Sequence, residues 1–474
     1  MKQATYAIIG GGIAGVSCAE GLSFLSADKS ILLISASPTV KMVSNVKHLT
    51  KMLSEFDVTE REISALGEQC PNVTVIQGIV KSVDPNRKQI ILEESDEIIE
   101  YEKLCISSGA KPKLIYTNDE RIIGIRDTDS VKELQKRIKT SKKVVIIGNG
   151  GIATELVYEI KGTEVVWVIK DSHISATFID PGAAQFFEQR VYGDNEGEEE
   201  QSSAPVKRLK YVISDGNNSL SDEQTGAALG PDWHTNVNLQ GLLEHNKKVT
   251  VEYCCELKKL VPDSDMIDKE WPVYAELTNG KIIGCDFIIS ATGVEPCIDF
   301  IKDTGIALAP DGGIKVDWKL ESSLKDVYAA GDACTCSWDL AEHWLQMRLW
   351  TQARQMGTYA AKAMHSSLNN EEFWQDFCFE LFTHVTSFFG MKVVLLGLFN
   401  GQRLNNSYEI LLRVTKNKEY IKLILKNGRL QGAVLIGDTD LEEMCENLIL
   451  NQIDLTDVAD DLLDPNLDID DYFD

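Results

Sequence analysis

An apolar strand that runs directly into closely spaced glycines is the feature that most constrains the fold of this chain. Four apolar residues precede Gly10, Gly12 and Gly15, which have the G-x-G-x-x-G spacing of a dinucleotide-binding turn. Such a run is typical of a buried parallel strand. The first glycine allows the tight turn, the second lets the backbone approach a pyrophosphate, and the third lets the next helix lie close to the sheet. We therefore expect a pyrophosphate at the N-terminus of a helix that begins with Ile13 and Ala14.

A second copy of this pattern occurs downstream, where an apolar strand precedes Gly148 and Gly150, and Ala153 takes the place of the third glycine. An acidic residue usually closes the second strand of such a unit and holds the ribose hydroxyls. Ser35 stands at that place in the first copy and Lys170 in the second. Because a base tolerates a 2′-phosphate, the second site favours NADPH or has no strong preference over NADH. An exposed lysine at a strand end explains Lys170 equally well.

Two further kinds of turn follow the glycine motifs. One strand ends at Ser108 and Gly109 and another at a Thr-Gly turn containing Gly293, each with a proline soon after. A small-residue turn at the carboxyl edge of an open sheet lets backbone close on a ligand. A third strand ends at Gly331 and Asp332, where a carboxylate can accept a sugar hydroxyl. These repeats indicate an internal duplication of nucleotide-binding domains.

Composition limits the remaining possibilities. A chain of 474 residues is expected to form several domains. Its formal charge of −26 argues against nucleic-acid binding through a basic face, and no stretch approaches the roughly 18 apolar residues of a membrane span. The first strand begins almost at once, so we expect no leader peptide and an intracellular location. No cysteine pair has the C-x-x-C spacing, and we expect no metal site.

The motifs at residues 6–332 resemble, in their order and spacing, the two-dinucleotide-binding flavoprotein family, also called the pyridine nucleotide-disulfide oxidoreductase family. The segments 230–234 and 346–357 and the ending at 471–474 extend the resemblance over nearly the whole chain. It implies FAD at the first glycine motif and NADPH or NADH at the second. The candidate cofactor-binding residues are Gly10, Gly12, Ile13, Ala14, Gly15, Ser35, Lys41, Val80, Ser108, Gly109, Gly148, Gly150, Ala153, Glu155, Lys170, Gly293, Gly331 and Asp332.

The fold class that follows is α/β, with two Rossmann-like dinucleotide-binding domains and a C-terminal α+β domain. The resemblance implies that the NAD(P)-binding domain, residues 126–289, is inserted in an FAD-binding domain formed by 1–125 and 290–370. Residues 190–245 carry acidic, basic and Gly-rich blocks, which favour a mobile surface insertion. The C-terminal domain is expected at 375–455. The acidic tail, 456–474, is either disordered or a peptide that docks on a basic partner or on its own protein.

The expected activity is hydride transfer from NAD(P)H to FAD, followed by electron transfer to an unidentified acceptor. Disulfide-reducing members of the family carry a redox cysteine pair after the first motif, but residues 35–60 contain no cysteine. Cys334 and Cys336 form the one pair that could approach the flavin, although structural thiols are the favoured interpretation. Further catalytic candidates are Lys41 or Lys47, as positive charge for the reduced flavin, and Glu155, which the resemblance places near the nicotinamide.

A second hypothesis has a different class of function. The protein would be a slow redox sensor or a protective flavoprotein that binds a protein partner through its C-terminal domain or acidic tail. Missing redox cysteines and charged appendages favour it. For each of Lys41 and Lys47 taken singly, a solvated loop residue is the simpler interpretation. The resemblance further implies a role in oxidative-stress defence in the cytoplasm and nucleus.

Overall fold

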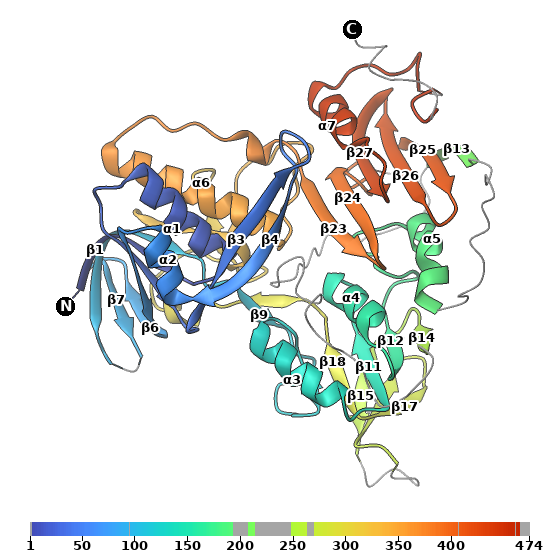
Figure 1. The fold of residues 1–474 in the computed structure, drawn as a ribbon, viewed down its shortest axis with the longest axis horizontal. Coiled ribbons are helices and arrows are strands. Elements are labelled where there is room, and N and C mark those ends of the chain that lie inside the picture. The colour runs from blue at the N-terminus through green and yellow to red at the C-terminus, as the bar shows by residue number, and fades with distance from the viewer. Residues whose placement is uncertain are drawn as a thin grey trace.

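The computed structural model describes residues 2–93, 95–192, 207–213, 248–262, 270–405, 407–459 and 461–464. Three sheets lie at the centres of three packed units (Figure 1). The segments 230–234 and 471–474, which contributed to the resemblance, lie outside the described residues. Among the described residues, no helix combines the length and the hydropathy that a membrane span requires.

The first unit is a parallel sheet in the strand order β5-β2-β1-β8, with β21 beside β8 and the antiparallel strands β7 and β6 at the far edge. Its strands are β1 (Lys2–Ile9), β2 (Ile31–Ser35), β5 (Val73–Gln77), β6 (Val80–Asp84), β7 (Gln89–Leu92), β8 (Ile98–Ile106) and β21 (Val327–Ala329). The strand β21 returns to this sheet more than two hundred residues after β8. A second unit is therefore inserted within the first, as the resemblance implied.

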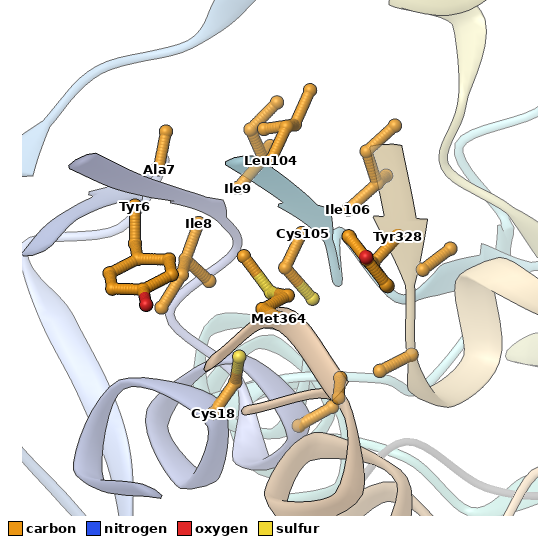
Figure 2. Close-up of a cluster of buried hydrophobic side chains, with 14 of the residues drawn as sticks. Tyr6, Ala7, Ile8, Ile9, Cys18, Leu104, Cys105, Ile106, Tyr328 and Met364 are labelled. Carbon is orange, nitrogen blue, oxygen red and sulfur yellow. The ribbon is translucent and has the colours of Figure 1, made fainter. Parts of the chain in front are cut away.

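Helices α1 (Ile13–Leu25) and α6 (Trp350–Asn369) cover one face of this sheet. Side chains alternate along β1, so Tyr6 and Ile8 point toward Cys18 and Met364 while Ala7 points to the opposite face (Figure 2). Side chains on both faces of β1 are buried in the core. The apolar run predicted from the sequence is therefore buried throughout the second half of the strand.

A long hairpin leaves this unit beside α1. It consists of β3 (Thr39–His48) and β4 (Ser54–Glu62), and helix α2 (Ile63–Gln69) follows it. Short strands β20 (Ile314–Val316) and β22 (Cys334–Cys336) pair near the return of the chain. At the tip of the hairpin, Leu53 is fully buried in a core otherwise formed by the C-terminal unit. The hairpin thus joins two units.

The second unit repeats the parallel arrangement in the order β10-β18-β11-β12-β14, and a small antiparallel sheet β15-β16-β17 packs against it. Its strands are β10 (Ile122–Ile123), β11 (Lys143–Ile147), β12 (Glu164–Val168), β14 (Val249–Glu252), β15 (Leu257–Val261), β16 (Val273–Leu277), β17 (Ile282–Cys285) and β18 (Phe287–Ser290), and its helices are α3 (Thr128–Ile138), α4 (Gly151–Glu159) and α5 (Pro181–Tyr192). The pair β9 (Ala110–Pro112) and β19 (Val294–Pro296) connects it to the first unit.

The third unit is an antiparallel sheet in the order β13-β25-β26-β27-β24-β23 with α7 (Glu442–Asn451) packed on it. Its strands are β13 (Lys207–Ile213), β23 (Thr383–Phe388), β24 (Met391–Gly397), β25 (Tyr408–Thr415), β26 (Glu419–Lys426) and β27 (Arg429–Ile436). This is the predicted α+β architecture, and Asn427 and Gly428 form the turn between β26 and β27.

One expectation about the charged segments needs correction. Residues 207–213, assigned to a loop of the insertion, form β13 and pair antiparallel with residues 408–414 of β25, and residues 190–192 end α5. An edge strand such as β25 presents unpaired backbone groups that another strand can satisfy. In the acidic tail, Leu462 and Leu463 are buried against the C-terminal unit, and Arg413 donates to the Leu463 carbonyl at 3.2 Å. The residues 193–206, 214–247 and 465–474 lie outside the described part.

Candidate functional site

A cavity of about 570 Å³ opens at the carboxyl ends of β1, β2 and β8. Sheet topology places it there, because ligands of open parallel sheets bind beyond the carboxyl ends of the strands. The candidate residues that line it are Gly10, Gly12, Ile13, Ala14, Ser35, Lys41, Val80, Ser108, Gly109 and Asp332. Segments far apart in the sequence therefore meet at one site.

The first glycine turn has the geometry of a pyrophosphate-binding loop. Gly10 has a φ of 120°, and a Cβ on it would lie 2.2 Å from the backbone oxygen of Ser107. A Cβ on Gly15 would lie 1.9 Å from the Gly10 oxygen, so α1 can approach the turn only with glycine there. By contrast, no atom lies within 4 Å of a Cβ placed on Gly12. That open space, beside a helix N-terminus without a side-chain cap, suits an anion.

Ser35 lies in the cavity wall, where the first unit's second strand ends. Its Oγ donates to the Thr39 carbonyl and accepts the Ser37 N–H, both at 3.2 Å. The hydroxyl thus holds the loop after β2 while it faces the cavity.

The two lysine candidates of the β3–β4 hairpin separate in the structure. Lys41 lines the cavity, and its Nζ lies 3.9 Å from a carboxylate oxygen of Glu60 on the neighbouring strand. Burial lowers the pKa of Lys41, and the charge of Glu60 opposes this shift. Lys47 is exposed farther along the hairpin, opposite Glu55, and does not line the cavity.

Asp332 presents a buried carboxylate to the same cavity. Only 8% of the residue is exposed, and within the described part of the chain no hydrogen bond reaches its side-chain oxygens. Burial raises the pKa of Asp332 to about 6, although Arg348 and Arg126 oppose the shift. Gly331, immediately before it, has a φ of 70°, a left-handed conformation that glycine adopts without strain. A buried polar group without a partner calls for one, and a sugar hydroxyl would supply it.

Three residues beside the cavity were not among the sequence candidates. Arg126 donates to Cys297 Sγ at 3.0 Å and to the Ser108 carbonyl at 3.3 Å. Arg348 donates to the Asp332 carbonyl at 3.3 Å. Neither Arg126 nor Cys297 belongs to a sequence motif, whereas Arg348 lies within the segment 346–357 that contributes to the resemblance.

The two cysteine candidates do not face the cavity. Cys334 is fully buried in the core, its thiol 3.4 Å from the Gly331 carbonyl, and Cys336 is two residues along β22. Burial raises the pKa of both thiols. All eleven cysteines, which lie in the described part of the chain, are free.

The second glycine turn reproduces the first. Gly148 has a φ of 131°, and a Cβ on it would lie 2.0 Å from the Ala291 carbonyl, while Gly150 again has open space. The turn therefore touches the end of β18, close to Gly293, which has a φ of 101°. Ala153 is buried where α4 meets the sheet.

The two remaining candidates of this unit differ in exposure. Glu155 is buried in the first half of α4. Lys170 is exposed beyond the end of β12.

Both turns fit a dinucleotide. The open space at Gly12 and Gly150, two uncapped helix N-termini and the partnerless carboxylate of Asp332 match a pyrophosphate at each turn and a polyhydroxylated group at the first. Gly10, Gly12 and Asp332 would hold FAD, and Gly148 and Gly150 would hold NAD(P)H. FAD bound there supplies a ring that accepts a hydride.

Comparisons with known proteins agree with this geometry. The model of the pyridine nucleotide-disulphide oxidoreductase family matches residues 4–195 and 237–357, and that of the rubredoxin NAD+ reductase C-terminal domain matches 387–453. The chain is 48% identical over 493 residues to pyridine nucleotide-disulfide oxidoreductase domain-containing protein 1 of Homo sapiens, covering 99% of this chain and 98% of the relative. The protein of that name from Drosophila melanogaster is 48% identical over 486 residues, covering 100% of both chains.

Solved structures share the fold at low sequence identity. The covalent complex of putidaredoxin reductase with putidaredoxin matches with a TM-score of 0.66 and 14% identity, over 96% of this chain and 94% of that one. Paired glycine turns, a nested second unit and a family model that spans most of the chain lead to one conclusion. The chain belongs to the pyridine nucleotide-disulphide oxidoreductase family and is an NAD(P)H-dependent flavoprotein oxidoreductase.

Proposed function

We propose that the protein passes a hydride from NAD(P)H to FAD and then delivers electrons to an acceptor without a dithiol relay beside the flavin. The single observation that carries this proposal is the cavity at Gly10–Gly15, which has a nucleotide turn, a buried carboxylate and a lysine but neither Cys334 nor Cys336 in its wall. Hydride transfer itself needs no protein acid or base. The residues contribute orientation and exclusion of water.

Each residue has a definite task in this scheme. The backbone N–H groups after Gly12 would bind the FAD pyrophosphate. The Asp332 carboxylate would accept a hydrogen bond from a hydroxyl group of the sugar chain between the pyrophosphate and the flavin ring. Lys41 supplies a positive charge, which favours the reduced ring. Glu155 stays our candidate for the nicotinamide side, and its role is a prediction.

We assign NADPH as the preferred donor. Lys170 is exposed beyond the end of β12, and among the described residues it forms no ion pair. The neighbouring Asp171 is engaged, because its carboxylate accepts a hydrogen bond from Asn149 at 2.7 Å. At the end of the second strand, a cation that no described acidic residue neutralises would suit the 2′-phosphate of a bound NADPH. The variant Lys170→Glu should reverse the preference toward NADH, and equal KM values of wild type and variant for NADPH would contradict the assignment.

Anaerobic stopped-flow spectroscopy of the purified protein tests the scheme. The flavin absorbance in the blue should bleach after mixing with NADPH and recover after mixing with an acceptor. Quinones, ferricyanide, disulfides and oxygen should be tried in turn. A protein that carries flavin but is not bleached by either nucleotide would exclude the proposed hydride transfer.

A protective or sensing role through a protein partner is the second candidate. The burial of Leu462 and Leu463 supports it, because this contact fixes residues 461–464 of the acidic segment on the C-terminal unit. We further propose that the protein acts in oxidative-stress defence in the cytoplasm and nucleus. Imaging of the tagged full chain and peroxide survival of knockout cells test these two points. A reduced flavin that turns over rapidly with a small acceptor would oppose the sensing role.

A further inference from the structure

The loop of residues 171–180 connects the second glycine turn to the C-terminal unit. At its start it holds Asn149, which lies between Gly148 and Gly150 of the second glycine turn and is largely buried. The Asn149 amide donates to Asp171 Oδ2 at 2.7 Å and to the His173 carbonyl at 2.9 Å. Its side-chain oxygen accepts the Ser175 N–H at 2.6 Å. The conformation of the turn thus depends on the loop.

The same loop contacts the first turn of α4. The hydroxyl of Ser175 lies 2.7 Å from that of Thr154. The ring of Phe178 lies over Gly151, where a Cβ would be 3.5 Å from it. The N-terminal N–H groups of α4, which would face a pyrophosphate, are therefore placed by loop contacts as well as by the sheet.

At its other end the loop is fixed to β26 of the C-terminal unit. Asp180 and Lys422 form an ion pair in which only 3% of the lysine side chain is exposed. Lys422 also donates to Asn400 at 2.9 Å. The Asp180 carboxylate accepts the Gly182 N–H at 2.7 Å, at the start of α5. Burial alone would raise the pKa of Asp180, but the lysine charge and these hydrogen bonds hold it below its ordinary value.

An aromatic contact reinforces this attachment. The ring centroid of Phe178 lies 5.3 Å from that of Phe388 and 6.1 Å from that of His384, both on β23. Tyr420 on β26 donates to Asp180 at 3.2 Å. The second unit and the C-terminal unit share one hydrophobic core here, so the loop has a rigid support.

We propose that Lys422 is a positioning residue for NAD(P)H, acting through Asp180, the loop 171–180 and Asn149 on the Gly148–Gly150 turn. This inference rests on the proposed function, since it assumes that the second turn binds the nucleotide. A shift of the loop would rotate the N–H groups of the turn away from the pyrophosphate. The loss of one hydrogen bond from the turn to the pyrophosphate would weaken nucleotide binding about tenfold. Lys422 would touch neither nucleotide nor flavin.

The variant Lys422→Met of the full-length holoprotein tests the proposal. We expect the Kd for NADPH, from a titration of the stopped-flow bleaching rate, to rise about tenfold while the limiting rate changes much less. FAD content should equal that of the wild type, because the first cavity is untouched. Lys422→Arg should recover most of the affinity, because it restores the charge opposite Asp180.

A matched control separates positioning from general destabilisation. Lys392 pairs with Glu442 at 2.6 Å inside the C-terminal unit, away from the loop. Lys392→Met should leave the Kd for NADPH unchanged. If Lys422→Met does not fold, Asp180→Asn/Lys422→Met removes the same link without a stranded buried charge, and it too should weaken NADPH binding.

Two results would overturn the inference: a wild-type Kd in FAD-loaded Lys422→Met or Asp180→Asn/Lys422→Met, or an equal loss of affinity in Lys392→Met. Nucleotide affinity should also be measured by thermal shift, which needs no electron transfer. Absence of bleaching in the wild type would refute the proposed hydride transfer, while the thermal-shift comparison would still decide the role of Lys422.

Discussion

The carboxylate of Glu446 on α7 accepts the backbone N–H of Met52 at 3.2 Å, and this contact joins the C-terminal unit to the tip of the hairpin that carries Lys41. It also accepts the hydroxyl of Thr50. Glu446 is 1% exposed. The polar groups at the tip of the hairpin are therefore hydrogen-bonded beside the hydrophobic core that contains Leu53.

Replacing Glu446 should therefore destabilise the junction. Glu446→Ala leaves a buried N–H and a hydroxyl without their acceptor, which should cost about 2–3 kcal/mol, whereas Glu446→Gln keeps one acceptor oxygen and should cost less. Thermal unfolding of the three proteins checks this order. Glu443→Ala, an exposed position on the same helix, is the control and should unfold like the wild type. Equal melting of both alanine variants would contradict the structural role of this contact.

Asp332 should destabilise the FAD-free protein at neutral pH and strengthen the binding of FAD. Burial raises its pKa to about 6, above the ordinary 3.8, so the contribution of this group to the stability of the FAD-free protein is complete below pH 3.8 and lost as the pH rises through 6. Asp332→Asn should therefore stabilise FAD-free protein at pH 8 by up to about 3 kcal/mol and leave it unchanged near pH 3.8.

FAD affinity should move in the opposite direction, because the amide accepts a hydroxyl less strongly than a carboxylate does. Chemical unfolding at several pH values and flavin titration measure the two effects. A stability difference that does not vary with pH would disprove the account of Asp332.

Lys41 and Lys47 provide a matched pair for electrostatics at the flavin. Lys41→Met removes a cation from the cavity wall and should slow flavin reduction by NADPH about tenfold and lower the flavin potential. Lys47→Met removes an exposed cation from the same hairpin and should change neither quantity. Stopped-flow rates and a spectroelectrochemical titration check this, and identical behaviour of the two variants would remove Lys41 from the mechanism.

His384 should make the protein sensitive to acid. It is enclosed by Trp350 and Phe178, and burial lowers its pKa to about 3. Its stabilising contribution is therefore present above pH 6.5 and is lost as the pH falls toward 3.

His384→Gln retains a polar partner for Thr351, whose hydroxyl is 3.2 Å from the ring. Between pH 6 and 4, His384 should make the stability of the wild type fall by up to about 1.4 kcal/mol per pH unit. The variant should lack this contribution, so its stability should depend less steeply on pH. Urea unfolding across this range measures the slope. Parallel curves for variant and wild type would show that His384 does not titrate on unfolding.

Local patterns were sufficient for the elements that bind the two cofactors. Gly10 and Gly148 were predictable because only glycine fits a positive φ where a Cβ would collide with a carbonyl oxygen. The spacing of the glycines in the sequence is enough to indicate this requirement. Lys41 and Lys47 were not separable, because both are polar residues in one segment. The register of β3 against β4 decided that the first lies in the cavity and the second in solvent.

The amino-acid sequence by itself determined the family, the two nucleotide turns and the order of the units, since apolar runs, glycine spacing and turn residues act over a few neighbouring positions. Tertiary structure alone decided the contacts between distant segments. It paired β13 with β25, fixed Asp180 on Lys422, joined Arg126 to Cys297 and buried Cys334 behind the cavity. These contacts depend on how whole units pack, and no local pattern encodes which buried charge will meet which partner.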